Sequence, residues 1–203
     1  GKMGFISGSA SFVRFSVEGE LPENLLDFVA DRVASFSFVD IDDNYDEYSI
    51  GWVSVLNMFD SDFNYASYAN GDYVTLTLRV DERKVSSAIV KKFVQKEEER
   101  IKAEKQIPKI SRSQKVEIKE RVTTELMRKA IPIPSVYDLC WNLSESTVLF
   151  FSTNKKAHAL VEDFFKESFG LMLKQQIPYV VGEQLLEEDE LDGLARITPD
   201  IFV

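Results

Sequence analysis

The sequence predicts an α+β fold, in which antiparallel hairpins form sheets, helices pack on those sheets, and a basic helical hairpin projects from the body. Short β-branched and aromatic runs alternate with segments whose apolar residues recur at helical spacing. The pair Asn70-Gly71, a strong signal for a tight turn, joins two of the strand-like runs. A single helical region holds most of the lysine and arginine residues of a chain that is otherwise acidic.

The N-terminal region predicts a strand followed by an amphipathic helix. Residues 9–17 (SASFVRFSV) are β-branched and aromatic, as strands usually are. Leu21-Pro22 is expected to open the helix, because proline favours the first helical turn. The apolar side chains of that helix recur at helical spacing and are Leu25, Phe28, Val29, Val33 and Phe36.

A strand and a hairpin are expected next. Residues 48–56 predict the strand, and Asn70-Gly71 joins the two arms of the hairpin after a loop rich in Asp and Asn. Residues of the second arm alternate between apolar and more polar types. We expect one set to face a core and the other to face solvent. The core set is Val74, Leu76, Leu78 and Val80, and the solvent set is Tyr73, Thr75, Thr77 and Arg79.

Two helices follow. Ser86 or Ser87 is expected to cap the first, which runs to about Gln106, and Ser111 with Gln114 resembles a capping box for the second, over residues 112–130. Few residues between positions 95 and 115 are apolar, so we expect the outer half of this pair to extend into solvent. The base is expected to pack on the sheet through Val85, Ile89, Val90, Phe93, Val94, Val122, Leu126, Met127 and Ala130.

The remaining chain predicts a second hairpin and a helix. Residues 136–143 and 147–152 form the arms, with the turn at Ser144-Glu145. The helix begins after Thr153 or Asn154 and ends near Gly170. The predicted domain organisation is an N-terminal α+β part (1–84), a basic helical hairpin arm (85–130), a hairpin-helix unit (131–170) and an unassigned C-terminal tail (171–203).

Charge is segregated along the chain. Residues 79–129 carry 16 Lys/Arg and 9 Asp/Glu, which leaves −17 for the remainder of a chain whose net charge is −10. A phosphate backbone responds to local potential, so a basic arm can bind nucleic acid on an acidic protein. The alternative is an ordinary solvated helix surface, because Glu97, Glu98, Glu99 and Glu104 are spaced to pair with nearby Lys and Arg.

The order of motifs resembles the RdgC recombination-associated proteins of bacteria. The resemblance covers about residues 11–170. It is carried by IGWVSV (50–55), ANGDYVTLTLRVDERKVSSAIVKKFV (69–94), the Lys/Glu-rich arm, VTTELMRKAIPIPS (122–135) and the segment 139–170.

This resemblance implies sequence-independent binding of double-stranded DNA by a homodimer that closes into a ring and limits access of recombinase or nucleases. It implies a nucleoid-associated protein that acts with recombination proteins and has no catalytic residues. The single cysteine predicts a cytoplasmic setting, and no motif in the sequence predicts a cofactor or a metal. The phosphate contacts would come from the basic positions of the matched arm, namely Lys91, Lys92, Lys96, Arg100, Lys102, Lys105, Lys109, Arg112, Lys115 and Lys119.

Two alternatives belong to other functional classes. A metal-dependent nuclease needs clustered carboxylates and a lysine. Residues 117–119 (EIK) and Pro199-Asp200 resemble the two halves of such a pattern. The two halves occur in the wrong order, however, and the first lies on a predicted helix where a strand is required. An acidic protein-interaction module without DNA contact would instead use the acidic body.

The remaining chemically reactive residues suggest structural roles. His158 has no cysteine or serine at motif spacing, so we expect a surface or half-buried side chain. Cys140 lies in an apolar stretch and is expected to be a buried thiol, which is typical of a reducing compartment. No apolar run approaches the roughly 20 residues that span a bilayer, so no membrane association is expected.

Overall fold

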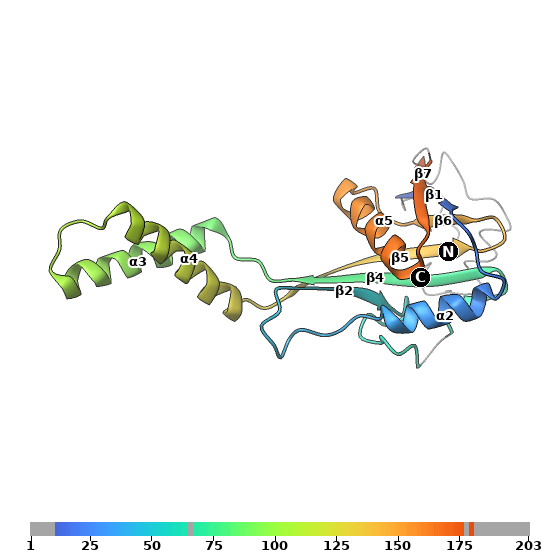
Figure 1. Cartoon of the computed structure of the whole chain (residues 1–203), viewed down its shortest axis with the longest axis horizontal. Helices are drawn as coiled ribbons and strands as arrows, with labels where there is room; N and C mark the ends of the chain where they lie inside the picture. The colour runs from blue at the N-terminus through green and yellow to red at the C-terminus, as the bar shows by residue number, and fades with distance from the viewer. Residues whose placement is uncertain (1–10, 65–66, 177–178, 181–203) are drawn as a thin grey trace. The chain divides into compact units, whose positions relative to one another are not determined.

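The computed structural model describes residues 11–64, 67–176 and 179–180 (Figure 1). This part of the chain contains four helices and eight strands, which confirms the α+β class. The elements in chain order are β1 (Ser11–Glu18), α2 (Leu25–Ser35), β2 (Tyr48–Val53), β3 (Ala69–Asn70), β4 (Tyr73–Glu82), α3 (Ser87–Lys105), α4 (Arg112–Lys129), β5 (Ile133–Asn142), β6 (Thr147–Phe150), α5 (Lys155–Phe169), β7 (Met172–Gln175) and β8 (Tyr179–Val180).

The described residues form two compact units. The first combines residues of Gly1–Val39, Ile50–Val80 and Ser135–Val203, and the second combines Asp40–Ser49 with Asp81–Pro134. The second unit therefore contains α3, α4 and the acidic loop 40–49. The domain boundaries expected from the sequence stay a prediction.

The strands of the described residues form one sheet in the order β2-β4-β5-β6-β1-β7, with β3 paired to β4 and β8 paired to β1. β1 runs antiparallel to both β6 and β7, so that Phe15 lies opposite Val148 on one side and Gln175 on the other. β7 and β8 come from the segment that the sequence left unassigned. Leu173 of β7 is buried in the core, which explains why this short strand forms.

The core of the first unit is rich in aromatic side chains. Trp52 of β2 lies 5.2 Å from Phe164 and 5.9 Å from Phe169 between ring centroids, and its indole nitrogen donates a 3.0 Å hydrogen bond to the Ser168 hydroxyl. Arg32 of α2 donates from Nε to the Ser168 carbonyl oxygen at 2.6 Å. These contacts join α2, β2 and α5 around one buried cluster.

Helix α2 begins at Leu25, so the expectation that Leu21-Pro22 opens it was wrong. Leu21 is 40% exposed, whereas Val29 and Val33 are fully buried on the expected face. Strand β2 ends at Val53, three residues earlier than predicted. The Ser54 amide there donates to the Asp60 carbonyl at 3.0 Å, which closes a loop and ends the strand.

Strand β4 is buried on both faces, which contradicts the prediction that one face meets solvent. Arg79 donates to the Met58 carbonyl at 3.0 Å, and its guanidinium carbon lies 4.2 Å from the centre of the Phe38 ring. Thr77 donates to an oxygen of Asp138 on the adjacent strand β5 at 2.5 Å. These polar side chains are therefore held by partners distant in the sequence.

The predicted hairpins are present with small shifts. Asn70 pairs with Tyr73, so the turn residues are Gly71 and Asp72, and Gly71 has the positive φ of 60° that such a tight turn requires. β5 begins at Ile133, three residues before its predicted start, and β6 ends at Phe150, two residues before its predicted end.

Helix α5 follows the prediction at both ends. The Asn154 side chain caps its first turn, and Gly170 ends it with a φ of 67°. Cys140 is buried, as expected. His158 is buried rather than exposed or half-buried: its Nε2 lies 2.6 Å from the Ser152 carbonyl oxygen, and the ring packs edge-on against Phe15.

Candidate nucleic-acid interface

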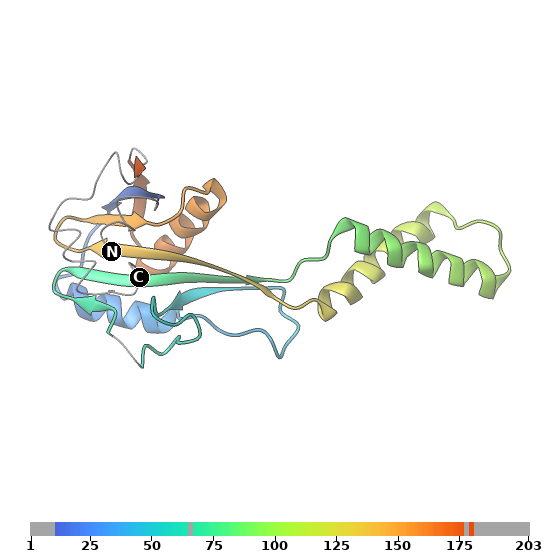
Figure 2. The same cartoon turned by 180° about the vertical axis from the view of Figure 1, so that it is seen from behind.

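Helices α3 and α4 lie side by side as a hairpin (Figures 1 and 2). Both predicted N-caps are confirmed. Ser86 accepts a hydrogen bond from the Ile89 amide at 3.2 Å, and Ser111 accepts from the Gln114 amide at 3.3 Å while the Gln114 side chain accepts from the Ser111 amide at 3.1 Å. Such caps satisfy backbone groups that the first helical turn leaves without partners.

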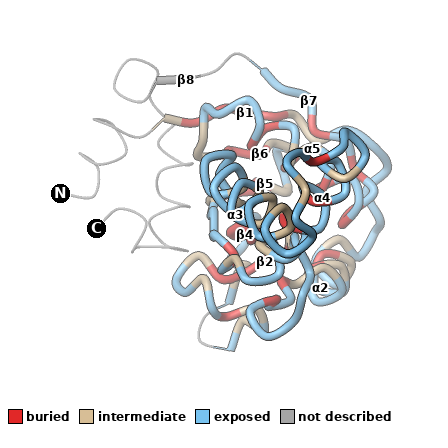
Figure 3. The backbone as a smooth tube through the Cα atoms, turned by 90° about the vertical axis from the view of Figure 1, so that its left-hand side faces the viewer, coloured by how far each residue is buried: buried red, intermediate tan, exposed pale blue. Residues whose placement is uncertain are grey.

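The hairpin has a small core of its own between its two helices. Ile110, Ile118 and Val122 are buried, and Val94, Ile101, Ile107 and Leu126 pack against them. The outer half of the hairpin therefore buries apolar surface, which the sequence analysis did not expect. Two of the expected base anchors, Ile89 and Phe93, are instead 45% and 36% exposed. Most of both helices is exposed in Figure 3.

Arg83 attaches the acidic loop to the base of the hairpin. The side chain is 5% exposed, and Nε donates to the Asp46 carbonyl at 2.8 Å. Its Nη2 donates to the carbonyls of Ile41 and Asn44 at 2.8 and 2.7 Å. Its Nη1 donates to the carbonyl of Ala130, which caps α4.

The charge of the second unit is unevenly distributed. Its residues include 15 Lys/Arg and 14 Asp/Glu, a net charge of only +1, because the loop 40–49 brings five acidic residues to the base. Residues 105–116, at the turn between the helices, contain four basic residues and no acidic one. The positive potential should therefore be strongest at this turn.

The ten predicted phosphate contacts fall on both helices and the connecting loop. Nine of the side chains are exposed, and Lys102 is half-buried. On α3, Lys92, Lys96 and Arg100 form one i, i+4 row, while Lys102 and Lys105 lie on a second side. The other candidates are Lys91 on α3, Lys109 in the loop, and Arg112, Lys115 and Lys119 on α4.

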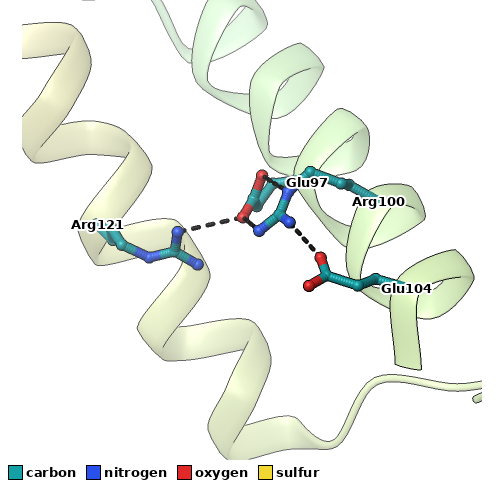
Figure 4. Close-up of polar contacts among 4 residues, drawn as sticks. All are labelled: Glu97, Arg100, Glu104 and Arg121. Atoms are coloured by element: carbon teal, nitrogen blue, oxygen red, sulfur yellow. Dashed lines mark hydrogen bonds and ion pairs between the residues drawn. The ribbon is translucent and has the colours of Figure 1, made fainter.

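Two of these ten candidates are engaged in ion pairs. Arg100 binds Glu97 at 2.6 Å and Glu104 at 2.5 Å, and Arg121 of α4 binds the same Glu97 oxygen at 3.1 Å (Figure 4). Lys102 binds Glu99 at 2.7 Å. The ion-paired surface that was the alternative interpretation therefore exists along the middle of α3. Within the described part of the chain, the other eight candidates form no ion pair.

The Glu97 network has a clear electrostatic consequence. Hydrogen bonds and charge from Arg100 and Arg121 lower the pKa of Glu97 from 4.5 to about 2. Glu97 is thus ionised at neutral pH, and its single negative charge is shared by two guanidinium groups. Arg121 was not among the predicted contacts, because its proximity to Glu97 depends on the register between the two helices.

Two hollows mark the hairpin surface. The first, of about 580 Å³, lies at the turn and is lined by Lys109, Ile110, Ser111, Arg112 and Lys115. The second is a groove of about 390 Å³ between the helices, lined by Phe93, Lys96, Glu97, Arg100, Arg121, Val122, Glu125, Leu126 and Lys129. Sequence reasoning missed the role of Lys129 in this groove, although Arg121, Glu125 and Lys129 form an i, i+4 row.

Only the first half of the nuclease-like pattern lies within the described residues. Glu117 and Lys119 are exposed on α4 and flank the buried Ile118, and Pro199-Asp200 lies outside the described residues. Across residues 11–64, 67–176 and 179–180, no group of three His, Cys, Asp or Glu side chains is placed to hold a metal ion. No helix in this part is long and apolar enough to cross a membrane.

A family comparison agrees with the motif order. The model of the family described as "Putative exonuclease, RdgC" matches residues 15–179, which include every helix of the described structure. No curated protein matches the chain. Because the matched region spans most of the 203 residues, the chain belongs to the RdgC family.

Proposed function

We propose that this protein binds double-stranded DNA without sequence preference, through phosphate contacts from the α3–α4 hairpin. The observation that carries the proposal is the turn between the helices, where four basic residues occur without an acidic one. Three of them, Lys109, Arg112 and Lys115, surround the hollow of about 580 Å³. Converging exposed cations of this kind attract phosphate oxygens.

The dimensions of the hairpin suit a duplex. A helix of 19 residues, such as α3, is about 28 Å long, which matches roughly eight base pairs of B-DNA. The row of Lys92 and Lys96 and the cations of the turn are distributed along this length. Phosphate contacts fix position and carry no sequence information directly, so affinity without sequence preference is expected.

Membership of the RdgC family is consistent with a role in recombination. We propose that the protein acts as a homodimer that closes into a ring around DNA and limits the access of recombinase or nucleases. A ring reconciles the net charge of −10 with DNA binding, because only the surface that faces the DNA needs to be basic. We further propose a cytoplasmic, nucleoid-associated location and no catalytic role.

The test is a fluorescence-anisotropy titration of unrelated duplexes across a salt series. If six phosphates are neutralised, log K should fall by roughly 5 per log unit of salt, equally for each sequence. End-labelled duplex incubated with Mg²⁺ or Mn²⁺ should remain intact. Absence of duplex binding at low salt by folded protein would overturn the proposal and direct attention to a basic protein partner of the acidic body. Progressive shortening of the duplex would overturn the non-catalytic role.

A further inference from the structure

Phe93 lies on the surface of α3 with two cations over its ring. The side chain is 36% exposed, and the ammonium groups of Lys92 and Lys96 lie 5.4 and 5.9 Å from the ring centre. An exposed aromatic ring flanked by flexible cations is the arrangement with which proteins bind single-stranded nucleic acid: the ring stacks on a base and the cations contact its phosphates.

The groove beside Phe93 supplies a site for one base. Its volume is about 390 Å³, and Phe93, Val122 and Leu126 form its apolar lining. Ligand sites usually measure roughly 300–1,000 Å³, so the groove is at the small end of that range and suits a single planar ring system. Lys96 and Lys129 lie at the same groove and are placed to contact phosphate.

The charges along the groove do not oppose a nucleotide. Glu97 is neutralised by Arg100 and Arg121, and Arg100 binds Glu104 as well. Two carboxylates and two guanidinium groups are therefore balanced within this network. Of the other lining residues that the structure describes, Lys96 and Lys129 are positive and Glu125 is negative. The remaining net charge is positive.

We propose that this groove binds an unpaired base of single-stranded DNA, stacked on Phe93, with the flanking phosphates contacted by Lys96 and Lys129. A base within a duplex cannot enter, because both of its faces are covered by its neighbours. The inference deepens the proposed DNA binding: the turn at Lys109, Arg112 and Lys115 holds phosphates of any DNA, and the groove adds affinity where a strand is unpaired.

The test combines crosslinking with a pair of variants of the full chain. A single-stranded oligonucleotide that carries 5-iodouracil, which crosslinks to stacked aromatic rings under long-wavelength light, should crosslink to Phe93, as mapped by mass spectrometry. Phe93→Leu keeps apolar volume but removes the ring, and it should weaken single-strand binding about 5- to 50-fold while leaving duplex binding within about twofold. Ile89→Ala, an exposed apolar position of α3 outside the groove, is the control and should change neither affinity.

Each outcome decides the matter. Crosslinks that map away from Phe93, or equal single-strand affinities for Phe93→Leu and Ile89→Ala, would overturn the base site even if duplex binding persists. If the unmodified protein did not bind duplex DNA, that result would instead refute the proposed function. Binding of an acidic peptide to the groove, together with the absence of any oligonucleotide crosslink to Phe93, would overturn the base site and show that the groove is a peptide site.

Discussion

The guanidinium of Arg83 donates a hydrogen bond to the carbonyl oxygen of Ala130, the residue that caps the C-terminus of α4. The same side chain binds three carbonyls of the loop 40–49. A cation at a helix C-terminus is favourable because the last carbonyls carry partial negative charge. One buried side chain thus fixes both the loop and the end of α4.

Replacing Arg83 should loosen the base of the hairpin. In Arg83→Leu, four carbonyl oxygens that are buried or partly buried lose their donor, and the free energy of unfolding should fall by about 3 kcal/mol. Urea denaturation measures this loss, and hydrogen exchange should increase near residues 126–130. Lys84→Leu, at the exposed neighbouring position, is the control; equal stability of the two variants would contradict the role of Arg83.

Two substitutions at Ser111, in the capping box, should affect stability and DNA binding differently. Ser111→Ala removes the acceptor for the Gln114 amide and should lower the free energy of unfolding by about 1 kcal/mol. Ser111→Asp keeps a capping oxygen but adds a negative charge at the hollow of the turn, so it should retain stability and weaken duplex binding. Thermal unfolding and anisotropy distinguish the two. Unchanged DNA affinity of Ser111→Asp would place the phosphates elsewhere.

Glu97 should restrain DNA binding by neutralising Arg100 and Arg121. Glu97→Gln frees Arg121 and leaves Arg100 paired only with Glu104. It should therefore increase duplex affinity more than Glu98→Gln, which removes the same charge from a residue outside the network. Anisotropy at fixed salt compares the two variants. Equal affinities would show that the released arginine does not face the DNA.

The ion-pair network around Glu97 also predicts that the stability of the hairpin depends on pH. The pKa of Glu97 is lowered from 4.5 to about 2, so its stabilising contribution is fully present above pH 4.5 and is lost as the pH falls toward 2. The unmodified protein should therefore lose hairpin stability over this window, and Glu97→Gln should lose less. Circular dichroism during acid titration measures the difference. If the unmodified protein and Glu97→Gln gave parallel titration curves, the network would contribute nothing to hairpin stability.

Asp138 predicts that stability changes with pH in the opposite direction. Burial raises the pKa of Asp138 above its ordinary value of 3.8, against the opposing effect of the Thr77 hydrogen bond. A raised carboxyl pKa means that stability decreases as the pH rises through it. Asp138→Asn keeps the acceptor for Thr77 and should be more stable than the parent at pH 7 by urea denaturation. The exposed Asp163→Asn is the control, and a less stable Asp138→Asn would refute the argument.

Helix caps and turns could be predicted from the sequence, because their structure is determined by a few neighbouring residues. The caps at Ser86, Ser111 and Asn154 and the turn at Gly71 each depend on a few adjacent residues, so they were predicted close to their observed positions. The burial of the polar side of β4 was not predictable in this way. Arg79 is held by Met58 and Phe38, which approach it only once the chain has folded.

In the candidate site, too, local features could be predicted from the sequence and contacts between distant residues could not. The exposure of Lys109, Arg112 and Lys115 followed from their apolar-poor surroundings in the sequence. The neutralisation of Arg121 by Glu97 did not, because it depends on the register between α3 and α4. Phe93 was expected to be a core anchor; its exposure reflects a hairpin core formed by other residues, Ile110, Ile118 and Val122.

The most direct test of the central claim is the salt dependence of duplex binding for two charge-matched triple variants. One replaces Lys109, Arg112 and Lys115 at the turn with Gln, and the other replaces the exposed Lys155, Lys156 and Lys166 of α5 with Gln. If the turn contacts phosphates, the first variant should lower the salt slope by about 2 to 3 and weaken binding, whereas the second should keep the parental slope. Equal slopes for both variants would contradict DNA binding by the α3–α4 hairpin.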